Sequence, residues 1–251
     1  MDVEPSYLKL FRSGELAARV KEAYDRLTSC DLCPLRCGAN RAAGEEGACL
    51  KGAMEIAWSM VRVRGIEPFL VGKRGAGEVT FSGCHLHCIY CVIKPYASFG
   101  RQINPAELAE LMLTFQERGC HNLQLVSPTH FVPHILEALE IAVSRGFRLP
   151  LVYNTSGYES LDTLKLLEGI VDIYLPDLKY GDPEVAKRYS GVEDYPRITQ
   201  EAIREMYRQV GDLVLDEEGV AVRGLVVRHL VLPKGVNSHF DLAQPLPIFA
   251  D

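Results

Sequence analysis

Residues 79–91 read VTFSGCHLHCIYC, a β-branched and aromatic run that leads directly into Cys84, Cys88 and Cys91. The run from Val79 to Phe81 has the composition of a buried strand. The spacings of three and then two residues place the three thiols in one compact loop. Three thiolates are one ligand short of a closed tetrahedral site, so the sequence leaves open what completes the coordination.

Strands and helices alternate along the chain that follows this loop. Asn104 and Pro105 are typical of a helix N-cap and first turn, and Gly119 and Gly146 are typical helix ends. Helices are predicted over 105–118, 133–145, 161–167, 184–189 and 198–210, and further strands over 123–126 and within LPLVYN, IVDIYLPDLK and GLVVRHLVLP. Strands that alternate with helices and are apolar on both faces predict five parallel strands with right-handed crossovers.

Polar residues follow the predicted strands at their carboxyl ends, where parallel α/β barrels carry their sites. They are Cys84 after the first strand, Ser127 and Thr129 after the second, Asn154 after the third, Asp177 and Lys179 after the fourth, and Arg228 in the fifth. We therefore expect these side chains to share one site.

The segment before the first parallel strand has a different character. Residues 6–28 predict two helices separated at Ser13 and Gly14, and residues 54–71 predict one or two extended strands. Between them lie Cys30, Cys33, Cys37 and Cys49, with spacings of two, three and eleven residues. Four thiolates can close a zinc site or ligate an iron-sulfur cluster, and four thiols can also remain reduced without metal. The number of cysteines does not decide among these three alternatives.

Composition narrows the class of protein. The 251 residues are 47% hydrophobic and 24% charged, as in ordinary globular proteins, and the net charge of -6 argues against a nucleic-acid binder. The N-terminus shows no secretion signal and no uncharged run is long enough to span a membrane, so we expect a cytoplasmic protein with no membrane association. In that compartment clustered cysteines favour metal over disulfides, and the isolated Cys120 is interpreted as a buried free thiol.

The loop C-x3-C-x-aromatic-C after the first strand of a parallel barrel resembles the signature of the radical S-adenosylmethionine (SAM) enzymes. Further stretches resemble the branch of the pyruvate formate-lyase activating enzymes, and within it the members with an N-terminal cysteine segment. They are CDLCPLRCGANR, VTFSGCHLHCIYC, LQLVSPTHFVPHILEAL, LVYNTSGY, DIYLPDLKY and VRHLVLP, which together cover about residues 28–233 in the same order. In that family SAM chelates the open iron of a [4Fe-4S] cluster. The reduced cluster then cleaves SAM, and the resulting 5'-deoxyadenosyl radical abstracts hydrogen from a substrate.

The resemblance implies an α/β fold, a partial (β/α)6-type TIM barrel over residues 73–251. Residues 1–72 would supply the N-terminal helices, the cysteine-rich metal-binding segment and short strands. The barrel is expected to be shortened at its C-terminus, because the sequence after Pro233 runs KGVNSHFDLAQPLPIFAD where the family continues to a sixth strand and helix.

The same resemblance assigns residues to the cofactors. Cys84, Cys88 and Cys91 would ligate the radical cluster, and Tyr90 would lie beside the adenine. Asp177 and Lys179 would lie near the methionine part of SAM, with Asn154 and Arg228 lining the same cavity. A buried Lys179 needs a partner, which the SAM carboxylate would supply; a structural pair with Asp177 is the alternative.

Two local departures accompany the match. Many radical SAM enzymes place Gly-Gly-Glu after the second strand to receive the SAM amino group, and here VSPTH stands there, with Ser127 and Thr129 as substitutes. The branch often has Gln-Asn after the third cysteine, where this chain has Val92 and Ile93.

The expected function is a radical SAM oxidoreductase that resembles the activating enzymes of glycyl-radical proteins, although no catalytic residue is assigned. Its partners would be SAM, an electron donor such as flavodoxin or ferredoxin, and a protein or small-molecule substrate. Two alternatives remain. One is a non-catalytic iron-sulfur electron-transfer or metal-binding module. The other is a zinc-stabilised domain in which His85 or His87 completes the three-cysteine site.

Overall fold

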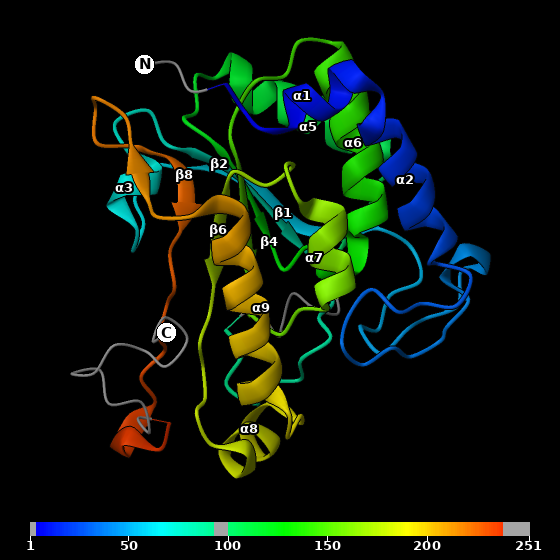
Figure 1. The fold of residues 1–251 in the computed structure, drawn as a ribbon, viewed down its shortest axis with the longest axis vertical. Coiled ribbons are helices and arrows are strands. Elements are labelled where there is room, and N and C mark those ends of the chain that lie inside the picture. The colour runs from blue at the N-terminus through cyan, green and yellow to red at the C-terminus, as the bar shows by residue number, and fades with distance from the viewer. Residues whose placement is uncertain (1–3, 93–99, 238–251) are drawn as a thin grey trace.

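The computed structural model describes residues 4–92 and 100–237, and within them eight strands form one mixed sheet. The sheet order is β3-β1-β2-β4-β5-β6-β8-β7. The parallel strands are β2 (Ala76–Phe81), β4 (Leu123–Val126), β5 (Leu151–Thr155), β6 (Ile173–Pro176) and β8 (Ala221–Leu225). The antiparallel strands are β1 (Glu55–Arg62) and β3 (Arg101–Gln102) at one edge and β7 (Val214–Leu215) at the other. The sheet curves without closing and is a partial barrel, as predicted (Figure 1).

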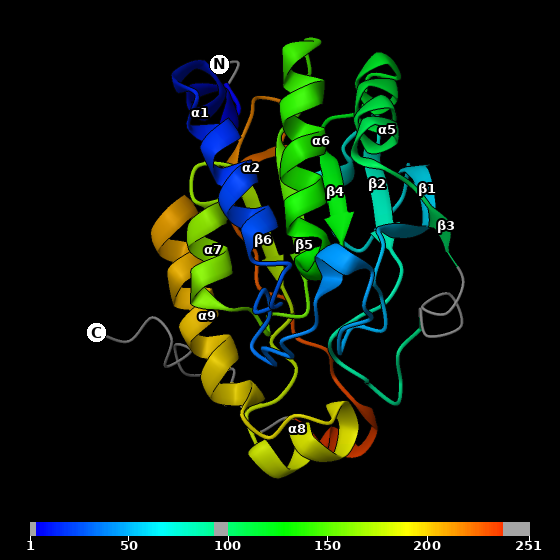
Figure 2. The same ribbon diagram turned by 90° about the vertical axis from the view of Figure 1, so that its right-hand side faces the viewer.

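Helices cover the outer face of the parallel strands, and α1 and α2 lie outside α6 (Figure 2). The helices are α1 (Tyr7–Ser13), α2 (Glu15–Asp25), α3 (Pro68–Val71), α5 (Pro105–Glu117), α6 (Val132–Ser144), α7 (Leu161–Leu167), α8 (Pro183–Ser190) and α9 (Tyr195–Val210). Short 3₁₀ turns occupy Arg41–Ala43, Thr129–Phe131 and Pro233–Gly235. Among the described residues, no helix combines the length and apolarity that crossing a bilayer requires.

The parallel strands form because both of their faces are buried. Every residue of β2 and of β6 is buried, including Glu78 of β2, whose carboxylate pairs with Arg62. The main core also includes Tyr7, Leu8 and Leu16 of α1 and α2, so the N-terminal helices pack into the same core as the barrel. The division at residues 72 and 73 stays a prediction, since β1 before it pairs with β2 after it.

The start of α5 is fixed by local chemistry. The Asn104 side chain accepts a hydrogen bond from the backbone N–H of Glu107 (2.9 Å), and the Glu107 carboxylate accepts one from the Asn104 N–H (2.8 Å). This reciprocal capping box satisfies two backbone donors that the first helical turn leaves unpaired.

Replacing Asn104 with alanine is expected to lower the free energy of unfolding by about 1 kcal/mol, because the cap acceptor is lost. Urea unfolding of Asn104→Ala, with Asn104→Ser as the rescuing variant, measures this. Equal losses in both variants would show that the cap contributes nothing.

Two expectations need correction. The sequence predicts one or two extended strands over residues 54–71. The strand β1 confirms one, but α3 occupies Pro68–Val71, because Pro68 at the first helical position presets a helical φ. The fifth strand was expected to contain Arg228, but β8 ends at Leu225. Arg228 instead forms an isolated parallel bridge with Asp177. Ile93 and most of the segment after Pro233 (residues 238–251) lie outside the described residues.

Candidate metal and cofactor site

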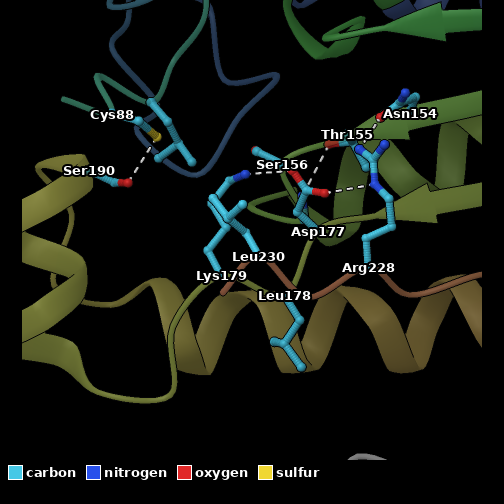
Figure 3. Close-up of polar contacts among 12 residues, drawn as sticks. Cys88, Asn154, Thr155, Ser156, Asp177, Leu178, Lys179, Ser190, Arg228 and Leu230 are labelled. Carbon is cyan, nitrogen blue, oxygen red and sulfur yellow. Dashed lines mark hydrogen bonds and ion pairs between the residues drawn. The ribbon is translucent and has the colours of Figure 1, made fainter. Parts of the chain in front are cut away.

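The three-cysteine loop leaves β2 at the carboxyl edge of the sheet. Its thiols are free; Cys88 is buried, and Cys84 and Cys91 are partly buried. The Cys88 Sγ lies 2.9 Å from the Ser190 Oγ at the end of α8 (Figure 3). The N–H of Cys91 donates to the Cys88 carbonyl (3.2 Å), which tightens the loop into a turn. The fold therefore gathers the three predicted thiols at one place.

The three thiols of this loop can ligate a cluster with one open iron, or a single ion that takes a fourth ligand. Among the described residues, no three Cys, His, Asp or Glu side chains converge on a point that could hold one metal ion. A tetrahedral zinc site needs sulfurs about 3.8 Å apart, given Zn–S bonds of about 2.3 Å, whereas the cysteines of a cluster bind different irons and stand farther apart.

Each histidine of the loop contacts a backbone carbonyl through its Nε2. The His85 Nε2 lies 2.9 Å from the Tyr158 carbonyl oxygen, and the His87 Nε2 lies 3.2 Å from that of Ala48. The His85 Nδ1 is buried and has no hydrogen-bond partner in the described chain, so His85 remains a candidate fourth ligand in the zinc alternative.

Burial favours the protonated form of two thiols of the loop, Cys84 and Cys88. It raises the pKa of Cys84 to about 12, and it also raises the pKa of Cys88, which Ser190 and Lys179 partly offset. A desolvated thiol ionises when a metal takes the place of its proton, so this site is suited to metal binding coupled to proton release.

A chain of hydroxyl groups connects the loop to α8. The Tyr90 hydroxyl is hydrogen-bonded to that of Tyr180, and the Tyr180 hydroxyl lies 2.6 Å from the Ser190 Oγ, which in turn contacts Cys88. Tyr90 was predicted from the sequence, whereas Tyr180 and Ser190 were not. Ser190 follows no recognisable motif, because its role arises from the packing of α8 against the loop.

A charged network spans the ends of β5 and β6 (Figure 3). The Arg228 Nε donates to the Asp177 Oδ1 (2.9 Å), and the Arg228 Nη2 donates to the Asn154 Oδ1 (2.6 Å). The Arg228 Nη1 also reaches the Glu67 Oε1 (3.1 Å), a partner that the sequence did not indicate. The Lys179 Nζ donates to the Asp177 Oδ2. The predicted Asn154, Asp177, Lys179 and Arg228 therefore form one network.

Lys179 is the buried cation of this network. Burial acts to lower its pKa, but Asp177 and the nearby Cys88 more than offset this, so the pKa of Lys179 is raised overall. In the structure its partner is Asp177, which is the structural pair that the sequence left as an alternative. Asp177 thus pairs with two cations, Lys179 and Arg228.

Ser127 and Thr129 follow β4 as predicted. Ser127 has φ of 54°, a left-handed conformation that is uncommon outside glycine, and its N–H donates to the Asn154 carbonyl (2.9 Å). The Thr129 hydroxyl is already engaged, because it donates to the Glu159 Oε1 (2.7 Å). A small cavity at this point is lined by Cys84, His85, Ser127, Thr129, His130 and Ser156.

Glu159 is a site residue that sequence reasoning missed. Its carboxyl is 1% exposed; the Oε1 accepts from the hydroxyls of Thr129 and Thr155, while the Oε2 has no hydrogen-bond partner in the described chain. Burial raises the pKa of Glu159 to about 7, although the two threonine hydroxyls lower it in part. No motif marks it, since it lies in a loop of small and polar residues.

This pKa gives a prediction of pH dependence. Glu159 keeps its proton up to about pH 7 when folded, but titrates near 4.5 when unfolded, so unfolding becomes more favourable as the pH rises between these values. Glu159→Gln should remove this effect and become about 3 kcal/mol more stable relative to wild type at pH 8 than at pH 4. Urea titrations at both pH values test this, with the exposed Glu22→Gln as control; a parallel shift of all three proteins would contradict it.

The four N-terminal cysteines are also close together. Cys30, Cys33 and Cys49 are buried and Cys37 is exposed. The N–H of Gly38 donates to the Cys30 carbonyl (2.9 Å) and the N–H of Cys30 donates to the Ala39 carbonyl (3.0 Å), which closes the loop that carries Cys33 and Cys37. Burial raises the pKa of Cys33 to about 12.

The sequence of the chain is similar to those of known proteins. The family model of the Radical SAM superfamily matches residues 79–216, from β2 into β7. An uncharacterized protein of Methanocaldococcus jannaschii is 27% identical over 247 residues, which cover 93% of this chain and 64% of that protein. The chain therefore spans about two thirds of the length of the curated relative that it matches.

Proposed function

The chain belongs to the radical SAM superfamily, and from this premise we propose that it activates a partner by hydrogen abstraction. When bound, the [4Fe-4S] cluster of this family supplies one electron that cleaves SAM to methionine and a 5'-deoxyadenosyl radical. The observation that carries the proposal is the placement of three free thiols beside a buried cation network at the carboxyl edge of a parallel sheet.

In this proposal, Cys84, Cys88 and Cys91 hold the cluster and leave one iron for SAM. Ser190 supports this arrangement from α8, because its hydroxyl lies 2.9 Å from the Cys88 sulfur and can donate a hydrogen bond to the thiolate. The buried environment of the thiols excludes water that would otherwise compete for the metal.

The cation network binds and orients SAM. Lys179 and Arg228 share Asp177, and a carboxylate that approaches them would replace part of this pairing at little desolvation cost, since all three groups are already partly buried. Asn154 fixes the Arg228 guanidinium by accepting from its Nη2. Tyr90 would contact the adenine, and Ser127 and Thr129 would face the amino group.

The substrate is proposed to be a protein whose backbone glycine becomes a radical, with flavodoxin or ferredoxin as electron donor. The stretches that resemble the activating-enzyme branch support this assignment. The proposal also includes a metal centre at the four N-terminal cysteines.

The test is anaerobic reconstitution with iron and sulfide, followed by SAM and dithionite and chromatography for 5'-deoxyadenosine. Product that requires both SAM and dithionite is expected. A stable cluster that yields no product would contradict the proposal and favour an electron-transfer module.

A further inference from the structure

The two cysteine segments lie against each other at the carboxyl edge of the sheet. A methyl group at Gly83, the residue before Cys84, would lie 2.6 Å from the Cys49 carbonyl oxygen. The His87 Nε2 of the three-cysteine loop lies 3.2 Å from the Ala48 carbonyl oxygen. Only a glycine fits between the segments at this point, so the two backbones are in direct contact.

A buried cation lies beside the N-terminal thiols. Arg41 is 3% exposed; its Nε donates to the Lys51 carbonyl (3.1 Å) and its Nη1 donates to the His130 carbonyl. Its Nη2 is buried and has no hydrogen-bond partner in the described chain. A buried guanidinium with an unused donor is costly unless an anion balances it.

Two of the thiols lie near the stem of this side chain. A methyl group at Gly47 would lie 3.5 Å from the Arg41 Cδ, 3.1 Å from the Cys37 Sγ and 3.7 Å from the Cys49 Sγ. Two sulfur atoms and the guanidinium stem therefore surround one point. Four thiolates carry more negative charge than the metal core that they bind neutralises. The resulting anionic centre would balance the charge of Arg41.

We propose that Cys30, Cys33, Cys37 and Cys49 hold an iron-sulfur cluster that passes electrons to the cluster of the three-cysteine loop, with Arg41 as its counter-cation. This inference deepens the metal centre of the proposed function and rests on that function. Four thiols can hold an iron-sulfur cluster or one zinc ion, and a count of iron and sulfide separates the two.

Contacts through His130 connect the two cysteine segments. An external one-electron donor of the flavodoxin or ferredoxin class would reduce a cluster held by the N-terminal cysteines. That cluster would be reoxidised when it passes the electron to a cluster held by the three-cysteine loop. Arg41 contacts the carbonyl of His130, and the His130 Nε2 lies 2.8 Å from the Ser82 carbonyl, two residues before Cys84. These contacts hold the two segments in a fixed relation.

The first experiment counts iron and acid-labile sulfide after anaerobic reconstitution. We expect about eight irons per chain in the wild type and about four in the variant with Cys84, Cys88 and Cys91 all replaced by alanine. Cys30→Ala/Cys33→Ala should also retain about four, now at the three-cysteine loop. If the triple variant binds no iron, or binds one zinc without sulfide, the inference is overturned. Failure of the proposed function itself would appear separately, as a wild type that holds both clusters but forms no 5'-deoxyadenosine.

The second experiment isolates Arg41. In the triple-alanine chain, Arg41→Gln should lower the midpoint potential of the N-terminal cluster, measured by EPR-monitored redox titration, because reduction adds negative charge that Arg41 balances. Arg36→Gln is the matched control, because Arg36 lies in the same segment but is exposed and pairs with Asp162 (3.1 Å). Equal potentials in the Arg41 and Arg36 variants, with iron retained and circular dichroism unchanged, would exclude the role given to Arg41.

Discussion

Replacing Cys88 with alanine is expected to reduce 5'-deoxyadenosine formation by more than about 100-fold. Loss of a side chain that hydrogen-bonds to a metal ligand typically lowers metal affinity or activity about 10- to 100-fold, and loss of the ligand itself should cost more. Cys88 is the most buried of the three thiols and contacts Ser190, so no neighbouring thiol can take its place without moving α8. Anaerobic turnover with SAM and dithionite measures the effect.

The matched control for this prediction is Cys120→Ala. Cys120 is also a buried free thiol, but it lies in the main core just before β4 and contacts neither cysteine segment as a hydrogen-bond partner. We expect this variant to keep its cluster and its activity. If both cysteine variants lose product formation equally, the effect reflects folding and not ligation.

The second large effect is expected from Asp177→Ala, measured on the apoprotein by urea unfolding. Asp177 is the shared acceptor of Lys179 and Arg228, and Lys179 has only 11% of its side chain exposed. Removing one partner of a buried pair typically costs about 3 to 5 kcal/mol, because the other charge is left uncompensated. Asp177 is partly exposed, so we expect a loss of about 3 kcal/mol, near the lower end of that range.

Asp162→Ala is the control for Asp177→Ala. Asp162 also contacts two cations, Arg36 and Lys165, but all three side chains are exposed and water screens them. Its loss should change the free energy of unfolding by no more than about 1 kcal/mol. If both aspartate variants lose the same stability, the network at β6 has no special role in the fold.

Much of the fold could be predicted because local signals agree with the tertiary structure. The apolar run Leu123–Val126 and the helix Leu161–Leu167 have the predicted bounds, and α5 begins at the predicted cap. Buried parallel strands are rich in apolar residues, and caps and glycines mark helix ends. These local signals locate the bounds of each element to within a few residues. The antiparallel pairing of β1 with β2 had no such local signal.

Two kinds of signal made parts of the site predictable. Asn154, Asp177, Lys179 and Arg228 were indicated by their places at predicted strand ends and by the family resemblance, and the cysteine loop by its spacing. Cys84, Cys88 and Cys91 lie within eight residues of one another, so their spacing alone indicates a shared metal site. Glu67 reaches Arg228 across 161 positions of the chain, and Ser190 reaches Cys88 across 102. Contacts of this range depend on the crossing of strands and helices, and neither residue belongs to a motif that would have indicated its partner.

The order of strands in the sheet has a consequence for how the chain assembles. The neighbours β1 and β2 form an antiparallel pair separated by a short connection, and β4, β5, β6 and β8 then add to one growing edge in the order of synthesis. Pairs close in sequence lose less loop-closure entropy and form first. Each βα unit can therefore dock as it leaves the ribosome without waiting for a later strand. Pulse-labelled hydrogen exchange should then protect amides of β1 and β2 before those of β6 and β8, and simultaneous protection would indicate one concerted step.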